Sequence, residues 1–80
     1  MKKKEYSFQI FYKEELITSA YISSNTFRDL KSDLDSSFTI STKLRHTAQY
    51  IEWSYIYSQP DFMLILIERK AKGNYYFKTY

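Results

Sequence analysis

Phe62-Met63-Leu64-Ile65-Leu66-Ile67-Glu68-Arg69 is the stretch of sequence that decides the fold. Its run of six apolar residues is too short for a helix and far too short for a membrane span. It is typical of an interior strand with apolar side chains on both faces. One face carries Phe62, Leu64 and Leu66, and the other carries Met63, Ile65 and Ile67. Each face therefore needs a cover.

Length and composition predict one compact domain over residues 1–80, because 80 residues cannot support two cores. Aromatic residues make up 20% of the chain, and their rings fill a small core densely. The chain has no cysteine, which excludes a disulfide scaffold, thiolate chemistry and a cysteine-rich zinc site. We expect no metal and no cofactor.

The basic N-terminus, Met1-Lys2-Lys3-Lys4, is followed by alternating polar and apolar residues rather than by the apolar segment of a signal peptide. We therefore expect a cytoplasmic protein, in the host cytoplasm if a phage encodes it, without membrane association. The net charge is +3, with basic residues gathered at both ends of the chain. This excess permits nucleic acid or an acidic protein as a partner and requires neither.

The first third of the chain predicts a β-hairpin followed by a helix. Residues 6–12 and 16–23 alternate in the manner of half-buried strands around a polar break. Residues 26–36 carry apolar side chains at helical spacing and are expected to form a helix. Thr26 and Asp29 have capping-box spacing, which predicts an N-cap at Thr26.

Residues 38–48 are compatible with a short strand or with a second helix, and such a segment is one possible cover for Met63, Ile65 and Ile67. From Gln49 the pattern is again that of a strand, and residues 58–61 form a turn around the only proline. Gly73-Asn74 is a two-residue hairpin signal that predicts a last strand over 75–80 and sets Arg69 opposite Lys78.

These elements predict an α+β fold in the order β-β-α-β-β-β, with an antiparallel sheet of about five strands and one helix on one face. The arrangement resembles the general layout of β-grasp domains. A shared layout does not imply a shared function.

The sequence offers few candidate catalytic residues, and we expect no enzymatic activity. His46 is the only histidine, and no partner that would orient it as a general base is evident. A small ribonuclease is the one enzymatic alternative, with candidates Arg45, His46, Arg69, Lys78 and Tyr80. Asp33 and Asp35 open like a calcium loop, but Phe38 stands where that loop requires glycine.

Binding of a macromolecule is the predicted function. If one helix covers one face of the sheet, then Met63, Ile65 and Ile67 need residues 38–48, a second copy of the chain or a target protein as a cover. Residues with A/T-rich codons are abundant, which indicates a low-G+C genome, and a short, compact product of such a genome is often a phage or mobile-element accessory protein. The first prediction is therefore an anti-CRISPR-like inhibitor that binds a host protein complex, such as a bacterial defence nuclease, stoichiometrically.

The alternative prediction is a small basic nucleic-acid-binding or transcriptional accessory protein. On the hairpin register above, cations and stacking rings share one face, as they do in single-strand binders. Together the two predictions give the candidate partner-binding residues Met63, Ile65, Ile67, Arg69, Tyr76, Lys78 and Tyr80.

Overall fold

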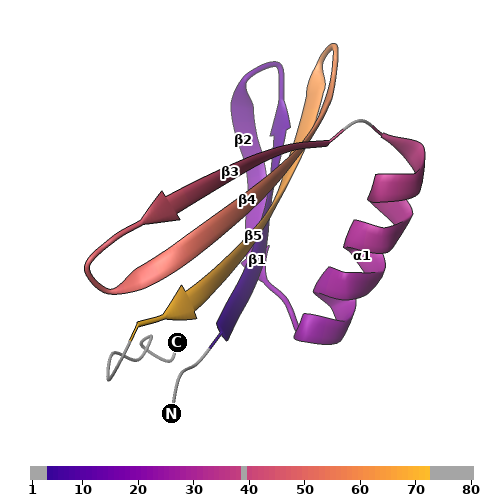
Figure 1. Cartoon of the computed structure of the whole chain (residues 1–80). Coiled ribbons are helices and arrows are strands. Elements are labelled where there is room, and N and C mark those ends of the chain that lie inside the picture. The colour runs from indigo at the N-terminus through magenta and orange to yellow at the C-terminus, as the bar shows by residue number, and fades with distance from the viewer. Residues whose placement is uncertain (1–3, 39, 73–80) are drawn as a thin grey trace.

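The computed structural model describes residues 4–38 and 40–72. Its elements in chain order are β1 (Lys4–Tyr12), β2 (Glu15–Tyr21), α1 (Ser24–Ser37), β3 (Ile40–His46), β4 (Tyr50–Gln59) and β5 (Phe62–Ala71). The strands form one antiparallel sheet in the order β2-β1-β5-β4-β3, and α1 lies along one side of it (Figure 1). The predicted α+β fold, its element order and its single helix are confirmed.

The central strand is β5, as its apolar run predicts. It pairs with β1 along one edge and with β4 along the other, so both of its edges are occupied. Arg69 lies opposite Glu5 on β1 and Glu52 on β4. The predicted register of Arg69 against Lys78 is therefore wrong, since β1 and β4 occupy both edges of β5 at Arg69. The last strand expected over 75–80 lies outside the described residues.

The ambiguous segment after the helix supplies an edge strand. Residues 40–46 form β3, which pairs only with β4 among the described elements. A second helix is absent from the described part of residues 38–48. The segment thus extends the sheet sideways and does not cover Met63, Ile65 and Ile67.

The helix begins earlier than its capping-box spacing predicts. Ser23 is the N-cap, with extended backbone, and its Oγ accepts a hydrogen bond from the backbone N–H of Thr26 at 3.1 Å. The expected N-cap at Thr26 is wrong because Ser23 satisfies the free N–H groups one turn earlier. Thr26 instead accepts at its own hydroxyl from Ser23 Oγ, at 2.9 Å.

The core lies between α1 and the sheet. Phe27, Tyr57 and Leu66 are its buried centre, and Leu66 is fully buried. Partly buried apolar side chains from both layers surround them, namely Tyr6, Phe8, Ile22, Leu30, Leu34, Phe38, Ile40, Tyr55 and Leu64. The predicted helix stripe therefore meets the even-numbered residues of β5. Phe62, at the end of that strand, stays 42% exposed.

The β1–β2 hairpin departs from simple alternation at one residue. Ile10 pairs with Thr18 but Phe11 pairs with Leu16, so Ile17 is an extra residue in β2. Such a bulge reverses the alternation of side chains, which places Leu16 on the same face as Phe11. The regular alternation predicted for residues 16–23 is therefore wrong at this point, since Leu16 and Thr18 lie on opposite faces.

Candidate functional site on the helix-free face

The two faces of the sheet differ in what covers them. One face packs against α1, and no described element lies over the other, which we name the helix-free face (Figure 1). Cross-strand registers assign to its central part Ser7, Gln9 and Phe11 of β1, Ser41 and Lys43 of β3, Ser54, Ile56 and Ser58 of β4, and Met63, Ile65 and Ile67 of β5. It is therefore a mixed surface, with apolar residues among small polar ones.

The structure places four predicted partner-binding residues on this face. Met63, Ile65, Ile67 and Arg69 alternate along β5 with the side chains that enter the core. Met63 and Ile65 are half-buried, and Ile67 is only 8% exposed. The other three predicted residues, Tyr76, Lys78 and Tyr80, lie outside the described residues.

Four charged residues cross the helix-free face in one row, which we name the charge ladder. Its members are Glu5 on β1, Arg69 on β5, Glu52 on β4 and Arg45 on β3, and each lies directly opposite the next. Charge therefore alternates from strand to strand. Opposite charges in directly opposed positions stabilise neighbouring strands.

The distances show a continuous network along the ladder. Arg69 Nη1 donates to Glu5 Oε1 at 3.3 Å, and Arg45 Nη2 donates to Glu52 Oε2 at 2.6 Å. The buried Nε of Arg69 lies 3.6 Å from Glu52 Oε2 and has no hydrogen-bond partner among the described residues. Both guanidinium groups also lie near the ring of Tyr50, and that of Arg69 is 5.0 Å from its centroid.

Glu52 is the least exposed charged residue of the ladder. Its side chain is 8% exposed, whereas that of Arg45 is 61% exposed. The hydrogen bond from Arg45 to Glu52 raises the pKa of the Arg45 guanidinium. The ladder therefore presents a buried carboxylate held by two arginines, and its charges sum to zero.

Sequence reasoning missed Glu5, Glu52 and Arg45 as members of this site. Each lies in an alternating stretch, so its face was predictable, but its partners depend on the strand order. Once β5 is placed between β1 and β4, the ladder follows from the register.

A shallow groove of about 490 Å³ runs over the same face beside the ladder. Residues from four strands line it, among them Gln9, Lys43, Ser54, Ile65 and Ile67. The small side chain of Ser54 forms a low point between β3 and β5. The groove thus combines apolar side chains with hydrogen-bonding groups and the arginines of the ladder.

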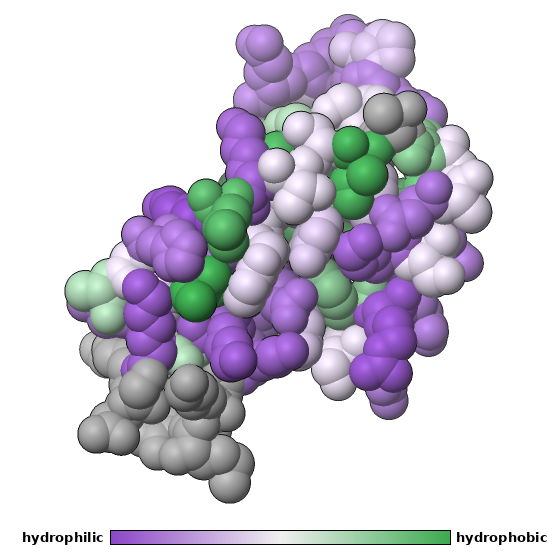
Figure 2. Space-filling view, in the orientation of Figure 1, coloured by the Kyte–Doolittle hydropathy of each residue, from purple (hydrophilic) through white to green (hydrophobic). Residues whose placement is uncertain are grey.

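The side of the molecule seen in Figure 2 has hydrophobic residues only as small patches, which hydrophilic residues separate. Elsewhere on the described chain the most exposed apolar side chains are those of Ile17, Tyr21 and Leu44, and the exposed Tyr12 and Phe62 are direct neighbours on β1 and β5. No helix in residues 4–38 and 40–72 is long and apolar enough to cross a membrane.

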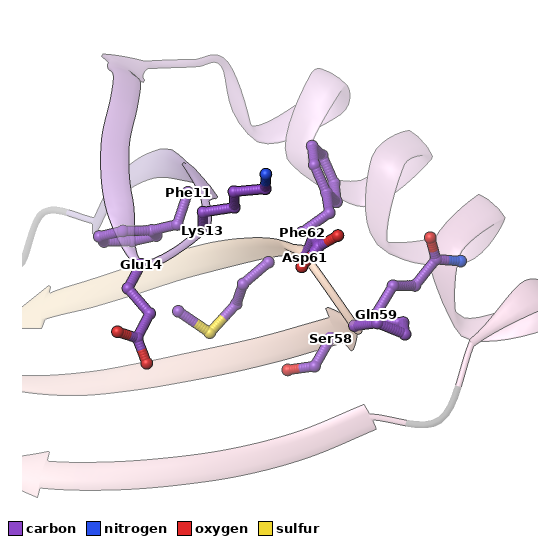
Figure 3. A pocket seen from close by; sticks show the side chains of 9 residues that line it. Phe11, Lys13, Glu14, Ser58, Gln59, Asp61 and Phe62 are labelled. Carbon is purple, nitrogen blue, oxygen red and sulfur yellow. The ribbon is translucent and has the colours of Figure 1, made fainter.

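A second hollow, of about 460 Å³, lies where the β1–β2 and β4–β5 turns meet. Figure 3 shows Lys13 and Glu14 from one turn facing Ser58, Gln59 and Asp61 around the other. The backbone N–H of Lys13 donates to the carbonyl of Asp61 at 2.8 Å, which ties the two turns together. This hollow continues the helix-free face through Phe11 and Met63.

The structure does not bring the ribonuclease candidates together. Arg45 and His46 are consecutive in β3, so their side chains point to opposite faces of the sheet. Arg69 lies on the face of Arg45, and Lys78 and Tyr80 lie outside the described residues. Asp35 in α1 is engaged on the helix side with Lys31 Nζ and Tyr57 Oη, each at 2.7 Å.

No family model, no curated protein and no solved structure matches the chain. The likeness to β-grasp domains is therefore one of element order alone.

Proposed function

We propose that the chain is a small binding protein that acts without catalysis, by occluding a surface of a partner protein with its helix-free face. The observation that carries this proposal is the second face of the central strand, where Met63, Ile65 and Ile67 have no cover from the described elements. Apolar side chains in the centre of a surface and polar groups around them are the usual anatomy of a protein interface.

The charge ladder supports a protein partner over nucleic acid. A phosphate backbone is bound by unpaired cations, whereas Arg69 contacts Glu5 and Glu52 on either side. A neutral row of alternating charge instead selects a partner with a complementary row and excludes others. The alternative of a nucleic-acid-binding accessory protein thus depends on residues outside the described part of the chain.

The most specific form of the proposal is the one that the sequence predicts, a phage or mobile-element inhibitor of a host defence complex. Stoichiometric occlusion needs only a stable small scaffold and one complementary face. The fold supports this proposal, because α1 packs on one face of the sheet and no described element lies over the other.

Affinity purification from cells of the host tests this function. Wild type, Ile65→Lys and the matched control Ile17→Lys are compared, because Ile17 is 59% exposed on the edge strand β2, outside the central part of the face. We expect a stoichiometric partner with wild type and Ile17→Lys but not with Ile65→Lys. Equal recovery with all three, or recovery of nucleic acid alone, would contradict the proposal.

A further inference from the structure

The charge ladder makes the helix-free face complementary to itself. We propose that two copies of the chain associate face to face, about a two-fold axis that runs parallel to the strands between β4 and β5. The inference rests on the proposed function in that both use the same surface. Self-association then regulates how much of the face is open to another partner.

The charges select this axis. It sets β5 of one copy opposite β4 of the second copy, and β1 opposite β3. Glu5 then meets the Arg45 of the second copy, and Arg69 meets its Glu52, so each of the four positions of the ladder faces an opposite charge. A guanidinium has enough donors to bind two carboxylates at once, so the contacts within each copy persist.

The other rows contain one charged residue, Lys43, which this axis sets opposite Ser7 of the second copy, and their remaining residues agree with the axis. Ile65 and Ile56 are direct neighbours on β5 and β4, so the axis brings Ile65 of one copy over Ile56 of the other. In the adjacent row the larger Ile67 meets Ser54, at the low point of the groove. Large residues therefore meet small ones or other apolar residues, as packed sheets require.

A two-fold axis perpendicular to the strands gives a poor match. It reverses the order of the rows and sets the ladder opposite the apolar end of the face, where Phe11 and Met63 lie. Charged groups then lose water without gaining a partner, which is costly. Only the axis along the strands satisfies both ends of the face.

The size of the face limits the strength of the association. Four strands spaced at about 4.8 Å and four rows spaced at about 6.7 Å give on the order of 500 Å² per copy. A standard specific interface buries about 800 Å² per partner. We therefore expect a weak dimer in equilibrium with monomer at micromolar concentrations, which leaves monomers free to bind a target.

Sedimentation velocity on the full chain, from low to high micromolar concentration, tests the inference. We expect a concentration-dependent dimer whose dissociation constant rises at least about tenfold in Ile65→Lys and stays unchanged in Ile17→Lys. A monomer at every concentration would overturn the inference. So would a dimer weakened by Ile17→Lys and not by Ile65→Lys, because that result assigns the contact to the edge of β2.

A charge exchange tests the pairing within the axis. Glu5→Arg and Arg45→Glu each create like-charge contacts in their own dimer, so each variant alone is expected to be monomeric. In an equimolar mixture the arginine introduced at position 5 meets the glutamate introduced at position 45 of the other chain, and a heterodimer should form. Two folded variants, judged by circular dichroism, that stay monomeric when mixed would contradict the proposed axis.

Failure of the dimer and failure of the proposed function give different results. A wild-type monomer that still loses its purified partner on Ile65→Lys would overturn the dimer and leave the function standing. A dimer for which no partner is purified would support the inferred dimer and overturn the proposed function. If either charge variant does not fold, the sedimentation comparison of Ile65→Lys with Ile17→Lys decides whether the helix-free face forms the dimer.

Discussion

Glu52 and Arg69 lie directly opposite one another on β4 and β5, with Arg69 Nε 3.6 Å from Glu52 Oε2. Glu52 is 7% exposed, although it lies on a face that no described element covers. Its side chain is enclosed by arginines on both sides and so is shielded within the sheet surface itself. This enclosure gives the helix-free face a rigid polar end next to its apolar residues.

Because Glu52 is enclosed and Arg45 is exposed, we expect their removal to lower the free energy of unfolding by unequal amounts. Glu52→Ala leaves Arg69 partly buried without its carboxylate and should lower the free energy of unfolding by about 1–3 kcal/mol. Arg45→Ala removes a side chain that is 61% exposed and leaves Arg69 beside Glu52, so its cost should be smaller than that of Glu52→Ala. Urea denaturation measures both, and equal small losses would show that Glu52 is not held as described.

We expect the protein to lose stability at alkaline pH because of Tyr57. Burial, and then the hydrogen bond to Asp35, raise the pKa of Tyr57 above its ordinary value of 10.0. The folded state therefore favours the neutral phenol, so this stabilisation is present below pH 10.0 and is lost as the pH rises further.

The matched variant for that test is Tyr57→Phe, which removes the ionising group and its hydrogen bond. Its urea midpoint should be lower than that of wild type near neutral pH, and it should fall less between about pH 9 and about pH 11. An identical alkaline decline in both proteins would assign the effect to other tyrosines.

Leu66 should be the most sensitive apolar position of β5. It is fully buried beneath α1, so Leu66→Ala leaves a cavity and should cost about 2–5 kcal/mol. Leu44 is 56% exposed on an edge strand, and Leu44→Ala should cost less than about 0.5 kcal/mol. Thermal or urea unfolding of the two variants compares them directly, and similar costs would contradict the placement of the core.

The β1–β2 turn offers a stabilising substitution. Lys13 and Glu14 have φ values of 48° and 67°, a left-handed conformation that Asn and Gly adopt more readily. The double variant Lys13→Asn/Glu14→Gly should raise the free energy of unfolding by about 0.5–1 kcal/mol. Glu14→Ala is the control and should give no gain. A loss of stability in the double variant would mean that other contacts of Lys13 or Glu14 outweigh backbone strain.

The sequence predicted the central strand, the two faces of that strand and the helix stripe, because each depends only on local periodicity. It did not predict that residues 40–46 extend the sheet beyond β4, since of the residues that alternate with Lys43 and Arg45 only Leu44 is apolar. Pairing is a long-range property, so the ladder appears only when the strand order is known. The bulge at Ile17 has no sequence signal, because a β-branched residue is also typical of regular strands.

Hydroxyl-radical footprinting of the protein bound to its purified partner tests most directly whether the helix-free face is the binding surface. Met63 on that face and Trp53 on the helix side are both half-buried and both readily oxidised, so each is a control for the other. We predict that the partner slows oxidation of Met63 and leaves Trp53 unchanged. Protection of Trp53 with no change at Met63 would contradict the account.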